Sequence, residues 1–275
     1  MTREDLIAEH GRIVAAHGPW GSHNVALPFG LHTIDSEPRG DNHRVVKFLQ
    51  MVQDLLRRPL AELRVLDLGC GEGLYAVEFA QQGAAALGVE GRAANFAKAE
   101  FARAALGLDR LSFVQGDVRD VTLERFGPFD VVLCSGLLYH LDAPAVFEVL
   151  AQLRRLCTGV LIIDTRIALS GDRRETWQGR EYLGATYREH APGASTDVKL
   201  AQLGASLDND ESFWFTRRSV VNLLADLGFS SVFECQLPVP LKILDDRITL
   251  AAVPGAPVQA RNALGDLHAR RWPPA

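Results

Sequence analysis

The sequence predicts an α/β fold built on a doubly wound, mostly parallel sheet, preceded by a helical extension. Three observations lead to this prediction. Short runs rich in Val, Leu and Ile alternate with helical patterns between residues 64 and 165, which is typical of a parallel sheet covered on both faces. A Gly-rich turn follows the first run, and acidic residues end the next two. Right-handed crossovers between such strands place helices on both sides of the sheet.

Length and composition agree with an ordinary globular protein. The chain has 275 residues, of which 47% are hydrophobic and 23% charged, so it is long enough for one large domain or two small ones. The net charge of -5 disfavours a general nucleic-acid binder. No apolar run approaches the roughly 18 residues of a membrane span, and charged residues occupy the first positions, where a signal peptide would be apolar. We therefore expect a cytoplasmic protein without a membrane partner.

The four cysteines carry no metal or disulfide signature. They stand at Cys70, Cys134, Cys157 and Cys235, and no two have the spacing of a zinc site. We expect reduced thiols and no bound metal.

Residues 1–63 form the N-terminal extension, which we expect to act as a helical lid. A polar helix is predicted near residues 4–17, followed by an irregular stretch from 18 to 41. Apolar side chains at i, i+3, i+4 and i+7 then indicate an amphipathic helix, with Asn42 as its cap and Pro59 just past its end. Its apolar residues are Val45, Val46, Phe48, Leu49, Val52, Leu55 and Leu56.

Residues 64–253 form the main domain, and residues 254–275 a flexible tail. The predicted strands are 64–68, 85–89, 111–115, 129–134 and 160–164, and the helices between them are 73–82, 92–107 and 143–157. Residues 166–215 interrupt the alternation as an insert with weak periodicity. Beyond it, Thr216 is typical of a helix N-cap and Gly228 of a helix end, around a helix at 219–227. Two closing strands follow at 231–237 and 247–253.

The most informative motif, V-L-D-L-G-C-G-E-G, occupies residues 65–73 at the end of the first strand. Glycines allow a tight turn and close approach of the backbone to a ligand. The motif departs from a dinucleotide fingerprint, because Leu74 stands where the third glycine would be. Asp67, two residues before Gly69, would repel phosphate. It suits a cationic ligand group such as an ammonium or a sulfonium.

Together with three segments further along the chain, this motif resembles motif I of the class I S-adenosylmethionine-dependent methyltransferases. Residues 87–90 end the second strand with Glu90, residues 114–118 lie at the end of the third, and residues 129–141 resemble motif IV and its loop. The resemblance implies a seven-stranded sheet of order 3-2-1-4-5-7-6 with strand 7 antiparallel, and S-adenosyl-L-methionine as the cofactor. It also implies that Glu90 binds the ribose hydroxyls, that Asp117 accepts from the adenine amino group, and that the Val118 N–H contacts the ring. The implied cofactor-binding residues are Asp67, Gly69, Cys70, Gly71, Glu90, Gly91, Asp117, Val118 and Ser135. Asp130 begins its strand, away from the other strand ends, and we interpret it as structural.

The flanking segments supply the candidate acceptor site. His140 is the leading candidate for a general base, needed only if the acceptor keeps a proton at neutral pH, and Tyr139 is a second catalytic candidate or a wall of the pocket. The candidate substrate-binding residues are Trp20, His23, His32, Arg166 and Trp214. Arginine forks and aromatic rings suit anionic and aromatic or cationic acceptors, although packing of the insert explains the aromatic residues equally well.

A second resemblance leaves an alternative open. The segment from Trp20 to Thr33 and the Tyr139-His140 pair are similar to the family that carboxymethylates the wobble uridine of tRNA. That family has basic residues after its Tyr-His pair, whereas Leu141 and Asp142 stand at these positions here. We therefore prefer methyl transfer to O, N or S of a small-molecule acceptor over a nucleic-acid substrate. A non-catalytic S-adenosylmethionine-binding module is the third hypothesis.

Overall fold

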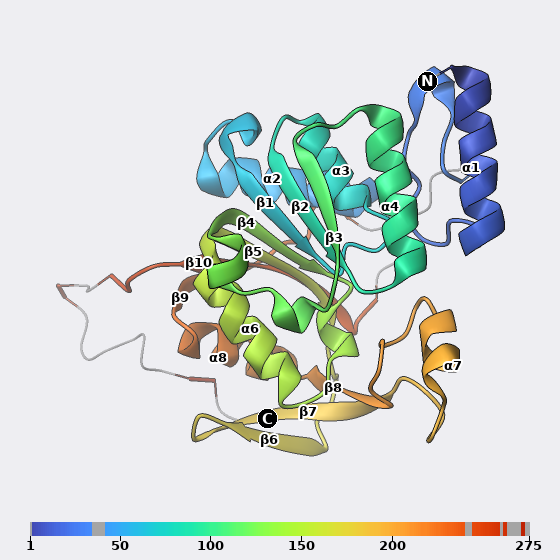
Figure 1. Cartoon of the computed structure of the whole chain (residues 1–275). Helices are drawn as coiled ribbons and strands as arrows, with labels where there is room; N and C mark the ends of the chain where they lie inside the picture. The colour runs from blue at the N-terminus through green and yellow to red at the C-terminus, as the bar shows by residue number, and fades with distance from the viewer. Residues whose placement is uncertain (1, 35–41, 240–243, 259–260, 263–270, 273–275) are drawn as a thin grey trace. The chain divides into compact units, whose positions relative to one another are not determined.

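The computed structural model describes residues 2–34, 42–239, 244–258, 261–262 and 271–272 (Figure 1). Its contacts divide the chain into two compact units. Unit 1 comprises residues 1–121, 129–135 and 236–243, and unit 2 comprises 122–128, 136–235 and 244–275. A seven-stranded sheet has the order β3-β2-β1-β4-β5-β10-β9. When the strands of this sheet are numbered by themselves, β9 is its sixth strand and β10 its seventh. The order is then the predicted 3-2-1-4-5-7-6, so the predicted fold class is confirmed.

Unit 1 holds the first four strands of this sheet. They are β1 (Arg64–Leu68), β2 (Ala85–Glu90), β3 (Leu111–Gln115) and β4 (Phe129–Ser135). β1 pairs in parallel with β2 and β4, and β2 pairs in parallel with β3. After its first residue, β1 is buried throughout, because helices lie beside these strands (Figure 1). Asp130 accepts the Arg64 N–H at 2.9 Å and a guanidinium N–H of Arg58 at 2.7 Å, which agrees with its structural interpretation.

The helices of unit 1 follow the predicted pattern. They are α1 (Arg3–His17), α2 (Asn42–Leu56), α3 (Leu74–Gln81) and α4 (Ala93–Leu106), with short 3-10 turns at Pro28–Gly30, Leu60–Glu62 and Val118–Asp120. A capping box between Thr2 and Asp5 begins α1. The buried face of α2 includes Phe48 and Val52, whereas Val46 is 54% exposed, contrary to its predicted place on the apolar face. The expected cap Asn42 lies outside the described side chains.

Unit 2 holds the closing strands of the same sheet. They are β5 (Cys157–Arg166), β10 (Arg247–Pro254) and β9 (Phe229–Glu234), with α5 (Leu123–Phe126), α6 (Ala145–Leu156), α8 (Arg217–Asp226) and a 3-10 turn at Leu138–His140. β10 runs antiparallel to both β5 and β9, as expected for the last strand. Thr216 caps α8 by accepting the Ser219 N–H, and Gly228 follows its end with φ +91°.

The prediction for residues 166–215 was incomplete, because this insert forms a second sheet. It consists of β6 (Arg173–Trp177), β7 (Arg180–Arg188) and β8 (Glu211–Phe215), all antiparallel, with α7 (Thr196–Ala201) between the last two strands. One face of β6 is half-buried and the other is exposed, and its sequence, mostly charged, has no apolar alternation from which a strand could be predicted. Its partner β7 stabilises it through the ladder of backbone hydrogen bonds.

The remaining predictions concern the cysteines, the tail and the membrane. All four cysteines are free thiols, three of them buried. Much of the predicted tail, together with residues 35–41 of the irregular stretch, lies outside the described residues. Within the described tail, Trp272 exchanges two backbone hydrogen bonds with the Asn222 side chain. Among the helices of the described residues, none has the length and apolarity of a membrane span.

Gly88 in β2 provides a first test of this packing. A Cβ atom at Gly88 would stand 2.4 Å from Phe113 and 2.8 Å from the Cys70 sulfur. We expect Gly88→Ala to lower the free energy of unfolding by about 1–3 kcal/mol through overpacking, measured by urea denaturation. The matched control is Gly11→Ala on the exposed face of α1, where a Cβ meets nothing within 4 Å. There alanine should stabilise by up to about 1 kcal/mol, and equal effects of the two substitutions would contradict the prediction.

Candidate functional site

The Gly-rich turn between β1 and α3 brings the backbone close to its neighbours. Gly71 has φ +56°, and a Cβ there would stand 3.3 Å from the imidazole carbon Cε1 of His23. Gly73 has φ +91°, and a Cβ there would stand 2.9 Å from Phe113 and 3.0 Å from Ala99. Both positions therefore require glycine, for backbone conformation and for space. Gly69 begins the same turn, also at positive φ.

Asp67 is buried below this turn, with an exposed fraction of 1%. Burial raises its pKa to about 8, the N–H of Ala76 opposes this rise, and the Glu90 carboxylate adds to it. Within the described part of the chain, its Oδ2 atom has no hydrogen-bond partner. Burial and the same two carboxylates also raise the pKa of the Cys70 thiol. Asp67 is thus a buried acidic group with one oxygen left to bind a donor or a cation.

Glu90 at the end of β2 is held by backbone donors. Its two carboxylate oxygens accept the N–H of Gly71 at 2.9 Å and the N–H of Arg92 at 2.8 Å. Burial raises its pKa, and the hydrogen bonds from Arg92 and Gly71 limit the rise. The carbonyl of Glu90 also accepts the Gly116 N–H at 3.0 Å, which connects the ends of β2 and β3. Gly91, the half-buried residue between Glu90 and Arg92, completes the turn.

The other predicted cofactor residues lie after β3 and at the end of β4. Asp117 accepts hydrogen bonds from the backbone and guanidinium of Arg119, and although burial would raise its pKa, these bonds lower it. Val118 is buried directly after it, and Ser135 is 9% exposed as the last residue of β4. The adenine contact of Asp117 stays a prediction, because Arg119 is its partner here.

These residues fit a positively charged ligand. The Glu90 carboxylate disfavours ionisation of Asp67, and Asp67 Oδ2 has no hydrogen-bond donor among the described residues. A sulfonium or ammonium would relieve both costs, because an opposite charge nearby favours the ionised carboxylate. A phosphate would increase them.

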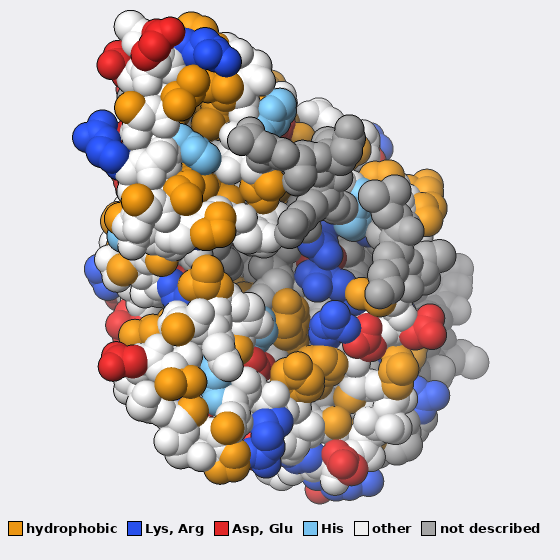
Figure 2. Space-filling model, turned by 90° about the vertical axis from the view of Figure 1, so that its right-hand side faces the viewer, with side chains coloured by type: hydrophobic (Ala, Val, Ile, Leu, Met, Phe, Trp, Pro, Cys, Tyr) orange, Lys and Arg blue, Asp and Glu red, His pale blue; other side chains and the backbone are white. Residues whose placement is uncertain are grey.

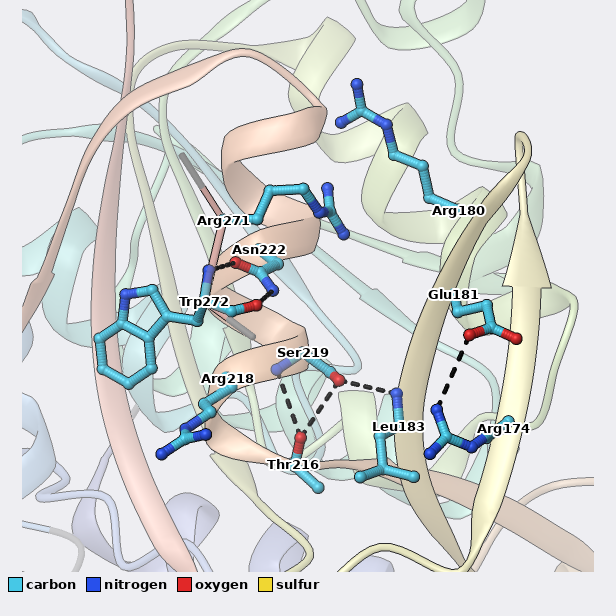
Figure 3. Close-up of a pocket in the computed structure, with 10 residues that line it drawn as sticks. All are labelled: Arg174, Arg180, Glu181, Leu183, Thr216, Arg218, Ser219, Asn222, Arg271 and Trp272. Carbon is cyan, nitrogen blue, oxygen red and sulfur yellow. Dashed lines mark hydrogen bonds and ion pairs between the residues drawn. The ribbon is translucent and has the colours of Figure 1, made fainter. Parts of the chain in front are cut away.

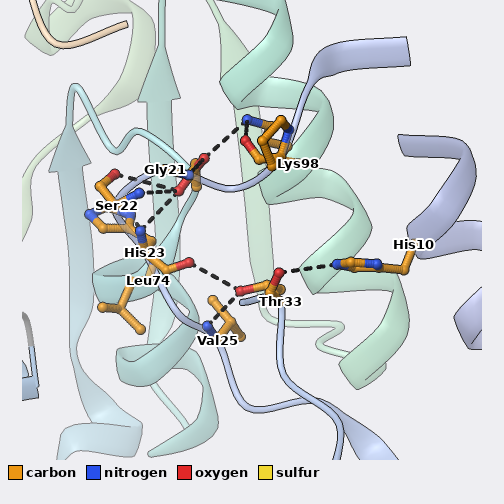
Figure 4. A network of polar contacts seen from close by, with 10 residues as sticks. His10, Gly21, Ser22, His23, Val25, Thr33, Leu74 and Lys98 are labelled. Atoms are coloured by element: carbon orange, nitrogen blue, oxygen red, sulfur yellow. Dashed lines mark hydrogen bonds and ion pairs between the residues drawn. The ribbon is translucent and has the colours of Figure 1, made fainter. Parts of the chain in front are cut away.

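The sequence analysis did not predict the ion pair between Glu72 and Lys98, which binds residues 19–23 to the Gly-rich turn (Figure 4). Glu72 accepts backbone N–H groups from Gly21 at 2.9 Å, Ser22 at 3.1 Å and His23 at 2.9 Å. It also binds the Lys98 ammonium at 3.1 Å, with side-chain exposures of 0% for Lys98 and 2% for Glu72. Burial would raise the Glu72 pKa, but the N–H donors and Lys98 lower it.

Of the two residues in this ion pair, only Glu72 lies in a motif that the sequence analysis identified. Glu72 belongs to the recognised motif, but nothing in the helical pattern of residues 92–107 distinguishes Lys98 from a solvated lysine. Lys98 also donates to the Pro19 carbonyl at 2.7 Å.

The N-terminal substrate candidates have different environments. His23 lies over the turn, where its Nδ1 accepts the Leu74 N–H at 3.3 Å. Trp20 is 5% exposed and stacks on His10, with ring centroids 4.7 Å apart, so packing accounts for its burial. His32 is exposed. A substrate role for each stays a prediction.

The remaining candidates lie together in unit 2. The Tyr139 carbonyl accepts the Trp214 indole N–H at 2.9 Å, and the Trp214 ring stacks on Tyr187 with centroids 4.4 Å apart. Arg166 lies over the Trp214 ring and is paired with Asp246. The His140 imidazole binds Glu189, a residue that sequence reasoning missed because it lies in the insert, 49 residues along the chain.

A separate cavity of about 190 Å³ in unit 2 contains none of the predicted site residues (Figure 3). Its lining includes Arg174, Arg180, Arg218 and Arg271. Arg174 is paired with Glu181, and both Arg180 and Arg271 are paired with Asp226. Glu181 and Asp226 thus bind three of the four arginines, and Asp226 is shared by two of them.

Comparisons with known proteins indicate a methyltransferase domain in this chain. A family model described as a methyltransferase domain matches residues 65–159. The tRNA U34 carboxymethyltransferase of Dichelobacter nodosus (strain VCS1703A) is 34% identical over 125 residues, 44% of this chain and 38% of that protein. The ubiquinone biosynthesis O-methyltransferase of Rhodopseudomonas palustris (strain BisB5) is 34% identical over 110 residues, 38% of this chain and 41% of that protein. The chain thus spans about two fifths of the length of these relatives.

Several solved structures match most of the chain. One of them is the N-terminal domain of EvdMO1 in the presence of SAH and D-fucose, with a TM-score of 0.69 and 23% identity over 93% of this chain and 98% of that chain. This likeness concerns the fold.

Proposed function

We propose that this chain, which matches a methyltransferase domain over residues 65–159, is a class I S-adenosylmethionine-dependent methyltransferase that transfers a methyl group to O, N or S of a small-molecule acceptor. The observation that carries the proposal is the pair of buried carboxyls, Asp67 and Glu90, beside a Gly-rich turn at the ends of parallel strands. This arrangement suits a cationic ligand with a diol. It is also the place where ligands bind in open α/β sheets.

The roles of the residues follow from their surroundings. Asp67 would face the cationic end of the cofactor, and Glu90, already oriented by two backbone donors, would accept from the ribose hydroxyls. Asp117 and Val118 would bind the adenine ring, and Ser135 would contact the cofactor at the end of β4. When bound, S-adenosylmethionine supplies an activated methyl group on a sulfonium, so alignment of the acceptor and exclusion of water account for much of the rate. The segment held by Glu72 would help exclude water.

Two observations support a small-molecule acceptor: the aromatic side chains of unit 2 and the distribution of surface charge. Tyr139, His140, Tyr187 and Trp214 form an aromatic cluster of the kind that binds small molecules. On the face in Figure 2, basic side chains are interspersed with acidic and hydrophobic ones, apart from one short basic column near the centre. On this face, the basic column is shorter than the stripe that tRNA binding would require. The name of the ubiquinone biosynthesis relative also describes methylation of a small molecule.

Calorimetry with S-adenosylhomocysteine tests cofactor binding. We expect the wild type to bind, and Glu90→Gln or Asp117→Ala to weaken binding by about tenfold, because each removes a charged hydrogen-bond acceptor. Asp120→Ala is the matched control, since Asp120 is exposed in the same 3-10 turn as Asp117. Absence of binding by the wild type would overturn the proposed function.

The match to a tRNA U34 carboxymethyltransferase supports one alternative. A wobble-uridine modifying enzyme would bind tRNA with an affinity that falls steeply as salt increases. Filter binding with bulk tRNA at two salt concentrations decides between the acceptors: we expect no such binding, and salt-sensitive binding would favour the alternative.

A further inference from the structure

A buried carboxylate in unit 2 holds one nitrogen of the His140 ring. Both Glu189 oxygens lie near His140 Nδ1, at 3.1 and 3.0 Å. The Glu189 side chain is 1% exposed, whereas that of His140 is 17% exposed. Among the described residues, no partner hydrogen-bonds the other ring nitrogen, Nε2. The contact with Glu189 therefore leaves Nε2, on the ring edge opposite Nδ1, as the nitrogen that can bind a ligand.

Two further donors keep Glu189 in its ionised form. The Ser206 N–H donates at 2.9 Å and the Ser212 hydroxyl at 2.9 Å. Burial alone would raise the pKa of Glu189, but His140 and these two donors lower it below its ordinary range. An ionised carboxylate only accepts hydrogen bonds, so Nδ1 of His140 must carry a proton. In neutral histidine, Nε2 then holds the free electron pair.

The backbone around His140 is fixed by the same part of the insert. Asn209 donates to the His140 carbonyl at 3.2 Å, and the Phe213 N–H donates to the Leu141 carbonyl at 3.0 Å. The ring centroids of Tyr139 and His140 are 4.3 Å apart. The connection between β7 and β8, together with β8 itself, thus holds both the imidazole and the carboxylate that orients it.

We infer that Glu189 is a positioning residue that makes His140 Nε2 a general base, and that the acceptor atom is a hydroxyl oxygen. This rests on the proposed function. The acceptor O–H bond breaks and its proton moves to Nε2. The oxygen electron pair forms the new bond to the methyl carbon, while the pair of the broken carbon–sulfur bond stays on sulfur, leaving a thioether. The imidazolium then returns its proton to solvent. An amine that is already neutral would need no such base.

The tautomer of His140 is the first test. Two-bond ¹H–¹⁵N spectra of the ¹⁵N-histidine-labelled protein distinguish the Nδ1–H from the Nε2–H form, with His140→Gln assigning the signal. We expect the neutral wild-type ring in the Nδ1–H form and a change toward the Nε2–H form in Glu189→Gln, whose amide can both accept and donate. Glu211→Gln is the control, because Glu211 is a half-exposed neighbour paired with Arg188. A wild-type Nε2–H form would overturn the inference.

The second test uses labelled methyl transfer from S-adenosylmethionine into a small-molecule cell extract. We expect methyl ethers as products, a loss of about a hundredfold in rate for His140→Gln and at least about tenfold for Glu189→Gln. Affinity for S-adenosylhomocysteine, measured by calorimetry, should stay unchanged in both variants.

The outcomes separate the two proposals. Failure of the wild type to bind S-adenosylhomocysteine would refute the proposed function itself. Binding together with N-methyl or S-methyl products, or with an unchanged rate in Glu189→Gln, would refute only the inference about His140 and Glu189. Binding without any transfer, by the wild type, would count against both.

Discussion

Replacing Lys98 by methionine should lower the free energy of unfolding by about 3–5 kcal/mol, because it leaves the Glu72 carboxylate buried without its cation. Lys98 is fully buried and Glu72 nearly so, and their charged atoms are 3.1 Å apart. Methionine keeps much of the side-chain length, so the cavity is small and the lost charge dominates. Urea denaturation followed by circular dichroism measures the effect.

Two further variants give this prediction its controls. Arg103→Met on the same helix removes a half-exposed partner of Glu100, and should cost no more than about 1 kcal/mol. Removing both charges with Lys98→Met and Glu72→Met should recover only part of the loss, because Gly21, Ser22 and His23 would keep N–H groups without an acceptor. Equal costs for Lys98→Met and Arg103→Met would contradict the expected cost of an unpaired buried charge. Hydrogen exchange of residues 18–34 should accelerate in Lys98→Met.

The second large effect concerns the pH dependence of stability at Asp67. Its pKa is about 8 in the fold and near 3.8 when unfolded, so the folded state holds one more proton between these values. Stability from this group is therefore fully present below about pH 4 and decreases as pH rises toward 8. One pKa unit corresponds to about 1.4 kcal/mol, so the decrease amounts to several kcal/mol.

Asp67→Asn should remove most of this pH dependence, because the amide stays neutral throughout. The expected result is a variant that gains stability relative to the wild type as pH increases from 5 to 8, in urea denaturation at each pH. Glu90, whose pKa is also raised, leaves a smaller slope of the same sign. Asp120→Asn, at an exposed position, should follow the wild-type profile. Parallel profiles for Asp67→Asn and the wild type would show that Asp67 is ionised in the fold.

Local signals predicted the cofactor half of the candidate site. Asp67, Glu90 and Asp117 lie at or near the ends of apolar runs, and carboxyl ends of parallel strands meet at one edge, so the strand pattern predicts that the three residues are neighbours. The positive φ values at Gly71 and Gly73 likewise agree with the turn that the motif predicted. The strand order came from the family resemblance, because periodicity identifies strands without ordering them.

Local sequence patterns could not predict the contacts between segments that are distant along the chain. From its sequence context, Lys98 is indistinguishable from an ordinary solvated lysine on a helix. Its burial depends on the contact with the Pro19 backbone, which is 79 residues away along the chain. The strands of the insert carry mixed charged and aromatic residues, and only their mutual pairing makes them a sheet.

The sequence by itself determined the α/β class, the Gly-rich turn and the acidic strand ends, because these depend on short-range periodicity and on backbone conformations that few residues adopt. The tertiary structure alone decided which charges are buried and paired: Lys98 with Glu72, and His140 with Glu189. The physical reason is that burial changes the cost of a charge by several kcal/mol, and burial depends on what the rest of the chain packs against it.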